Sequence, residues 1–349
     1  MQKKKTRVSR KVRRARPRER SDAPLYDVPD SHTSYETALL KSISAGHRGA
    51  GVSRHALMFC SLMANATPSM RTLNYRHGVA VGRSLYQICA QRRGYALYEE
   101  SVDDVVSFFE RAGYGRITYR VLPSAVTIEM HDMLRLSLGM NTHLFEAGIM
   151  SGFLTAARGQ LTNVVELSCS NNSAGSCEFR TSASIPDSGT PEINSVFGAF
   201  VDDVSRRVSS NECRDTGISD EYYALSSLVL LDSKYFGEMK VIAGYLGGML
   251  ASSLRMEKMP PKRILEAVER SVGLLGMGVT GIKTSGSFDF ELRFSKLHSR
   301  REFTELSVAF LNGLLRNASK GAGMSAKCLI HNNTYTVLLS RSKQGKRVH

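Results

Sequence analysis

The chain has 349 residues, 42% of them hydrophobic, which is enough for two or three domains with apolar cores. The formal net charge is +15, but residues 1–20 alone hold eleven Lys or Arg and one Glu, which leaves +5 for the rest. No stretch reaches the ~18 apolar residues of a membrane span, and no apolar segment follows the charged start as in a secretory signal. We therefore expect a cytoplasmic protein without membrane insertion.

Residues 1–35 are predicted to form a disordered basic tail and a linker, because like charges repel and almost nothing apolar is available for burial. Such a tail would bind a polyanion by releasing counterions, so nucleic acid or an RNA-rich particle is its expected partner. The alternative is a tail that only improves solubility. The candidate nucleic-acid-binding residues are Lys3, Lys4, Lys5, Arg7, Arg10, Lys11, Arg13, Arg14, Arg16, Arg18 and Arg20.

The chain then alternates between helical and strand-like patterns. Residues 36–70 are expected to form an N-terminal helical segment, followed by helices at 74–91 and 100–113. Two alternating β-branched stretches around Pro123 predict a hairpin. Another helix is expected at 141–159, and the segments NVVELSCS and SCEFRTS predict a second hairpin. Residues 186–225 would bridge to the C-terminal third and contain one helix.

The C-terminal third repeats this order of elements, which indicates an internal duplication with a unit of roughly 110 residues. The two units would be residues 71–185 and 226–341, with a short basic tail at 342–349. Each unit reads helix, helix, hairpin, helix, hairpin. The expected fold class is therefore α/β in the broad sense, more strictly α+β, with two tandem units and antiparallel sheets packed as a pseudo-dimer. A homo-oligomer is also possible on this pattern.

The segment ELSCSNNSAGSC carries Glu166, Cys169 and Cys177, and it raises three alternatives. It could be a turn closed by a disulfide, a pair of buried thiols, or part of a metal site. A reducing cytoplasm argues against the disulfide. A zinc site needs four ligands drawn from Cys, His, Asp and Glu.

A hairpin would bring Cys169 and Cys177 together, but Glu166 lies three residues before Cys169. A regular strand would point residues at that spacing to opposite faces, so a bulge or loop at 166–169 is required for all three to converge. The fourth ligand must come from another element, and His143 at the start of the preceding helix is the natural candidate.

This pattern resembles the 4-vinyl reductase domain family, also called the hydrocarbon-binding domain, whose fold is shared with TRAPP-type tethering subunits. In its aromatic-sensing members zinc is held by a cysteine, a glutamate 23 residues later, and cysteines three and eleven residues after that glutamate. Glu166, Cys169 and Cys177 match the last three positions, and His143 replaces the first cysteine. The resemblance covers residues 71–185 and, more weakly, 236–341.

The resemblance implies a structural zinc ion in the first unit only. In the second unit Cys328 persists, but the other ligand positions correspond to Thr304, Ser325, and Tyr335 or Thr336. It also implies an apolar cavity between helices and sheet, in which the first unit would bind a small hydrophobic ligand. The chain has no tryptophan, which argues against a phenol sensor because those members use one to bind their ligand.

Gly148 and Gly152 place small residues on one face of the helix at 141–159, which either leaves room for a ligand or allows close helix packing. No nucleophile–base pair or phosphate-binding loop is visible. We therefore expect a non-enzymatic, zinc-containing, ligand-binding protein with a regulatory role. The alternatives are a TRAPP-like scaffold for protein assembly and a reductase acting on a tetrapyrrole side chain.

Overall fold

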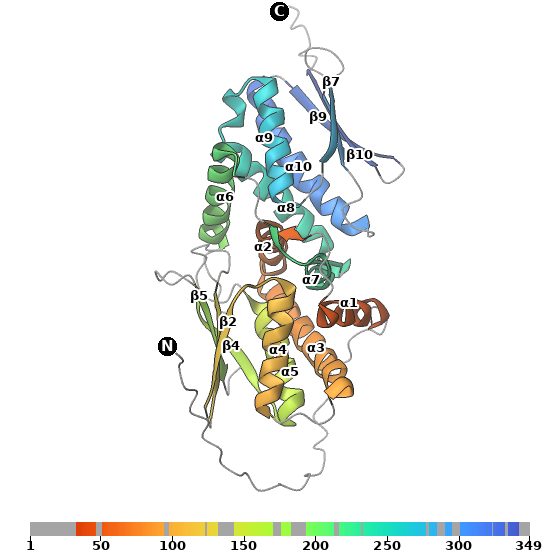
Figure 1. Ribbon diagram of the computed structural model, residues 1–349. Coiled ribbons are helices and arrows are strands. Elements are labelled where there is room, and N and C mark those ends of the chain that lie inside the picture. Colours follow the sequence, from red (N-terminus) through yellow and green to blue (C-terminus); the bar gives the residue numbers. More distant parts are fainter. Residues whose placement is uncertain are drawn as a thin grey trace, which may run out of the picture.

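The computed structural model is an elongated α+β protein with two halves, each containing helices and a four-stranded antiparallel sheet (Figure 1). The basic tails at the two ends fall outside the described residues, as do the side chain of Cys169 and all side chains of the second sheet. The described ranges are 33–46, 51–93, 98–122, 124–131, 143–169, 176–182, 193–212, 216–231, 233–276, 279–284, 290–294, 301–322, 324–331 and 334–341.

The first half follows the expected order of helix, helix, hairpin, helix and hairpin. Its sheet has the strand order β2-β3-β5-β4, with all neighbours antiparallel. On β3 the residues alternate between buried and half-buried, so one face of the sheet is packed against the helices. The elements are α3 (Pro68–Arg93), α4 (Tyr98–Ala112), β2 (Ile117–Val121), β3 (Val126–His131), α5 (Leu144–Arg158), β4 (Asn163–Cys169) and β5 (Ser176–Ser182).

The second half has the same order of elements, and its sheet β7-β8-β10-β9 has the equivalent strand order. The two sheets lie on opposite sides of the long axis (Figure 1). Descent of the halves from one duplicated unit stays a prediction. The elements are α8 (Ser233–Ser253), the 3-10 helix η3 (Met256–Lys258), α9 (Pro261–Leu274), β7 (Val279–Thr284), β8 (Phe290–Phe294), α10 (Arg301–Ala322), β9 (Met324–His331) and β10 (Thr334–Arg341).

Each half is preceded by a helix, a very short strand and a further helix. Strands β1 and β6 pair with each other in antiparallel fashion and join the halves at the middle of the molecule. The next helix begins in both cases at a serine cap, because Ser53 Oγ accepts a hydrogen bond from the amide of His55 and Ser219 Oγ from that of Tyr222. These leading elements are α1 (Thr33–Ala45), β1 (Val52–Ser53), α2 (Arg54–Ala64), α6 (Ile193–Ser210), β6 (Thr216–Ile218), α7 (Asp220–Ser226) and the 3-10 helix η2 (Ser227–Leu231).

The leading helices α2 and α7 each pack against the opposite half. On α2, Phe59 contacts Phe200 of α6 and Phe310 of α10, with ring centroids 6.5 and 5.3 Å apart. On α7, Tyr222 is fully buried and its ring lies 6.0 Å from Phe108 of α4 and 6.1 Å from Phe145 of α5. The halves therefore share one continuous apolar core through exchanged helices.

Glycines bring α3 and α5 into backbone contact. A methyl group added at Gly82 would lie 2.0 Å from the carbonyl oxygen of Ile149, and one at Gly152 would lie 2.0 Å from that of Val79. Both distances are far inside van der Waals contact, so Gly148 and Gly152 serve close helix packing rather than a ligand space. In the second half, Gly313 meets the carbonyl of Gly244 in the same way.

Candidate metal centre

Three of the four predicted zinc ligands converge between the start of α5 and the β4–β5 hairpin of the first half. His143 precedes the first turn of α5, Glu166 lies on β4 and Cys177 lies on β5. One potential ligand atom from each residue lies within 4.8 Å of the other two, and all three residues are buried. The arrangement is able to hold a metal ion.

The His143 and Glu166 side chains make a close buried pair. His143 Nδ1 lies 2.8 Å from Glu166 Oε1, and the backbone amide of His143 donates to Glu166 Oε2 at 3.1 Å. Both carboxylate oxygens are thereby oriented at the N-terminus of α5, where the helix dipole favours a negative charge. Only 4% of Glu166 and 5% of His143 is exposed, so a bound ion would have protein ligands in place of its coordinated water.

The bulge that the sequence spacing required is present in β4. Across the β4–β5 ladder Glu166 pairs with Phe179, Ser168 pairs with Glu178, and the register shifts between Glu166 and Ser168. The extra residue is Leu167, which is exposed. Because a bulge sets two residues opposite one, the odd spacing from Glu166 to Cys169 acts like the even spacing of a regular strand.

The same ladder places Cys169 directly opposite Cys177. The side chain of Cys169 lies outside the described residues, so its contact with the other three ligands stays a prediction. Residues that pair directly across an antiparallel ladder share a face of the sheet. The backbone register is therefore compatible with a fourth ligand at this position.

The sequence did not reveal Arg71, the largest fully buried side chain of the described residues and 1% exposed. Burial lowers the pKa of its guanidinium, and the charge of Glu166 opposes that shift. A signal was available, because Arg71, Tyr75, Gly78 and Gly82 recur at helical spacing on the stripe of α3 that packs inward. A cation on a buried stripe indicates a buried partner.

The second half differs at the corresponding strands. Cys328 of β9 lies opposite Val337 of β10, and the register along this pair is continuous. The residue that corresponds to Cys177 by register is therefore Val337, which corrects the expected Tyr335 or Thr336. The β9–β10 ladder also has no register shift like that at Glu166.

A second buried carboxylate, Glu146, lies one turn beyond His143 on α5. The hydroxyls of Tyr114 and Tyr222 both donate to its Oε1, the latter at 3.2 Å. Burial, followed by the charge of Glu146, raises the pKa of both tyrosines well above the ordinary value. Since Tyr222 belongs to α7, this cluster joins the two halves.

A buried histidine–aspartate pair joins α2 to α6. His55 Nε2 lies 2.8 Å from Asp203 Oδ2, and Arg206 and Arg207 also bond the Asp203 carboxylate. Burial alone would raise the pKa of Asp203, but the hydrogen bonds from His55 and Arg206 and the nearby positive charges lower it below its ordinary value. We assign this pair to the stability of the junction between α2 and α6.

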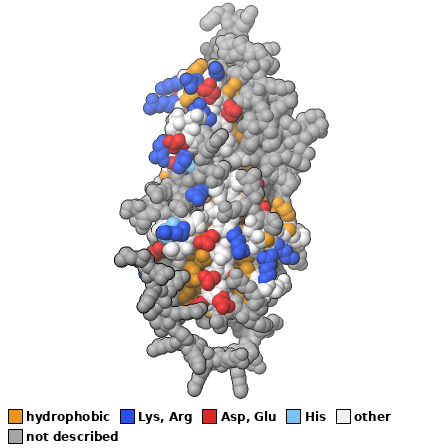
Figure 2. Space-filling view, viewed as in Figure 1, with side chains coloured by type: hydrophobic (Ala, Val, Ile, Leu, Met, Phe, Trp, Pro, Cys, Tyr) orange, Lys and Arg blue, Asp and Glu red, His pale blue; other side chains and the backbone are white. Residues whose placement is uncertain are grey.

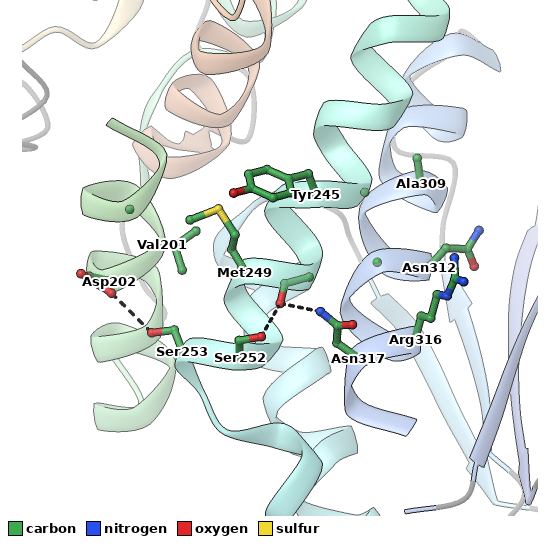
Figure 3. A pocket seen from close by; sticks show the side chains of 14 residues that line it. Val201, Asp202, Tyr245, Met249, Ser252, Ser253, Ala309, Asn312, Arg316 and Asn317 are labelled. Carbon is green, nitrogen blue, oxygen red and sulfur yellow. Dashed lines mark hydrogen bonds between the residues drawn. The ribbon is translucent and has the colours of Figure 1, made fainter. Parts of the chain in front are cut away.

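A groove of about 840 Å³ lies between α6, α8 and α10 in the second half (Figure 3). Its lining includes glycines of all three helices together with Tyr245 and Met249. At one end Asn317 Nδ2 donates to the carbonyl of Gly248 at 3.0 Å, and Ser253 Oγ donates to Asp202 at 3.4 Å. This groove is separate from the His143, Glu166 and Cys177 site.

Comparisons with known proteins identify no relative of this chain: no protein-family model, curated protein or solved structure matches it. The resemblance to the 4-vinyl reductase domain therefore rests on the ligand spacing. Among the described residues, no helix combines the length and the apolar character needed to cross a bilayer.

Proposed function

We propose that the protein is a non-enzymatic zinc protein in which His143, Glu166, Cys169 and Cys177 hold one structural ion. The observation that carries this proposal is the convergence of a histidine, a carboxylate and a thiol from three separate elements. Imidazole nitrogen, carboxylate oxygen and thiolate sulfur are the donors that zinc prefers. Mixed sulfur and nitrogen ligation disfavours Mg²⁺ and Ca²⁺, which take oxygen ligands.

A structural role is supported by the burial of His143, Glu166 and Cys177, and it requires Cys169 as the fourth protein ligand. A catalytic zinc site keeps one position open for water or substrate, whereas a closed site contributes folding energy. The ion would join the start of α5 to both strands of the β4–β5 hairpin. The bulged end of β4 would then be held by metal bonds in place of regular ladder hydrogen bonds.

Metal analysis of the purified protein tests the proposal. We expect one zinc per chain in the wild type and none in the Cys169→Ser/Cys177→Ser variant. Cys89→Ser is the matched control, because Cys89 is half-buried on α3 and belongs to no metal cluster of the described residues. Equal zinc in the wild type and the double variant would refute the site.

The basic tail supports a second proposed role, binding of nucleic acid or an RNA-rich particle through residues 1–20. On the face shown in Figure 2, Lys and Arg side chains are interspersed with Asp and Glu, so that face offers no continuous cationic surface among its described residues. We expect a salt-dependent mobility shift that is lost when residues 1–20 are deleted. Binding retained by the truncated chain would move this role to the folded part.

We also propose that the protein binds a small hydrophobic ligand. The sequence predicted this ligand in the first unit, whereas the site we now propose for it is the groove between α6, α8 and α10 in the second half. Its volume falls in the range of roughly 300–1,000 Å³ that is usual for ligand sites. Native mass spectrometry of protein from cells should show a retained compound that Gly248→Leu, which fills the groove, abolishes. A visible flavin or tetrapyrrole spectrum would instead favour a reductase.

A further inference from the structure

We infer that Arg71 is the counter-ion of the metal centre, and that the site binds zinc tightly because this buried guanidinium neutralises the loaded cluster. The inference rests on the proposed zinc site. It adds a residue outside the predicted ligand set and explains why an arginine lies inside the protein.

The packing of α3 against α5 places Arg71 beside the start of α5. The two helices run parallel: the carbonyl of Tyr75 faces Gly148, and four residues further along each helix the carbonyl of Val79 faces Gly152. One turn before Tyr75, Arg71 is therefore level with residue 144, next to His143. Its side chain is 1% exposed, so water does not screen its charge.

The charges of the proposed cluster require such a partner. A Zn²⁺ ion with two thiolates, one carboxylate and one neutral imidazole carries a net charge of −1. A buried net charge is costly unless an opposite charge lies close by. Arginine is suited to this position because its guanidinium keeps its proton at all ordinary pH values, whereas a buried lysine readily loses its own.

The second half provides an internal comparison. In the first half Gly82 of α3 lies against Ile149 and Phe153 of α5. In the second half Gly247 of α8 lies against Phe310 and Leu314 of α10 in the same way. The two glycines are therefore equivalent, which aligns α3 with α8. By this alignment the position of Arg71 is occupied by Phe236, whose ring lies under Lys240 at 5.1 Å. The half that lacks the ligand set therefore also lacks the buried arginine.

The test measures zinc affinity by competition with a chromophoric chelator for full-length variants. Arg71→Met, which keeps the length but removes the charge, should weaken zinc binding about 10–100-fold, the usual effect of losing a partner outside the ligand set. Arg71→Lys, which carries the charge only while its buried ammonium stays protonated, should lose less affinity than Arg71→Met but more than a neutral change elsewhere on the stripe. Tyr75→Phe, one turn along the same buried stripe, removes the hydrogen bond to Ser151 at 2.7 Å without changing charge and should stay within about threefold.

A charge-compensated variant separates electrostatics from packing. Replacing one thiolate ligand by a neutral imidazole in Cys169→His makes the loaded cluster neutral, so Arg71→Met should then cost less than about threefold. If the single variant Arg71→Met does not fold, the zinc affinity of the double variant Arg71→Met/Cys169→His is compared with that of Cys169→His.

Three results would count against the counter-ion role or the zinc site, and each result identifies which of the two is wrong. Zinc affinity of Arg71→Met within about threefold of wild type would overturn the counter-ion role. An equal loss in the Cys169→His background would also overturn it, since the effect would then be packing. Absence of zinc from the wild type would instead overturn the proposed function on which the inference rests.

Discussion

The Nδ1 atom of His143 lies 2.8 Å from Oε1 of Glu166, although the residues belong to different elements and neither is exposed to solvent. Removing the imidazole should therefore remove a proposed zinc ligand and leave a buried carboxylate without its partner. We expect His143→Ala to weaken zinc binding by more than about 100-fold, beyond the usual effect of outer-shell changes. The control is His131→Ala, because His131 on β3 bonds Thr118 at 3.0 Å outside the cluster. Equal zinc affinity in both variants would exclude His143 as a ligand.

Removal of the proposed zinc ion should lower the stability of the first half. A ligand that binds only the folded state raises the free energy of unfolding by roughly 4 kcal/mol when its concentration is a thousand times Kd. We expect a strong chelator to lower the Tm of the wild type by several degrees. The Cys177→Ser variant should begin at the lower Tm and should not respond. Differential scanning fluorimetry with and without chelator checks this, and an identical response of both proteins would contradict it.

The bulge at Leu167 predicts which face of β4 Glu166 and Cys169 occupy when residues between them are deleted. Deletion of Leu167 alone leaves Glu166 and Cys169 two positions apart, and residues at that spacing share a face of a regular strand. This variant should still bind zinc. Deletion of both Leu167 and Ser168 makes the two ligands adjacent, turns them to opposite faces and should abolish binding. Zinc content measured for the pair tests the register, and loss in the single deletion would count against our account of the bulge.

The close approach of α3 and α5 predicts a large difference between two Gly→Ala substitutions. At Gly152 the added methyl would meet the Val79 backbone at 2.0 Å, and overpacking of this kind costs about 1–3 kcal/mol. At Gly198 on α6 no atom lies within 4 Å of the added methyl. There alanine should raise the free energy of unfolding by about 0.5–1 kcal/mol through its better helix propensity. Urea denaturation distinguishes the two, and similar effects would show that the helices can separate without cost.

The α2–α6 junction should lose stability in acid. The folded-state pKa of Asp203 is below its ordinary value of 3.8, so its contribution is present above that value and is lost as the pH falls through the folded pKa. Asp203→Asn should be less stable than wild type near pH 7, and the difference should shrink as the pH falls below 4. Asp202→Asn alters an exposed neighbour and should leave the pH profile unchanged. A constant difference between wild type and Asp203→Asn at all pH values would argue against this linkage.

The sequence by itself determined the order of helices and hairpins in both halves, because the periodicity of apolar residues and the capping residues act over a few positions. The spacing of Glu166 and Cys169 also stated a geometric requirement, which the bulge meets. His143 was expected beside these residues, and its Nδ1 atom does lie 2.8 Å from Glu166 Oε1, whereas its role as a ligand stays a prediction. These features depend on contacts that are local, lie within one hairpin, or join elements that follow one another in the chain.

Only the tertiary structure decided which surfaces meet. The exchange of α2 and α7 between the halves buries Phe59 and Tyr222 against residues more than a hundred positions away, and no local pattern specifies such partners. For Arg71 the helical spacing placed the charge on the inward stripe of α3, but only the packing of α5 along that helix decided what lies beside it. Burial of a charge depends on every element around it, and therefore the electrostatics of the proposed zinc site became visible only in the tertiary structure.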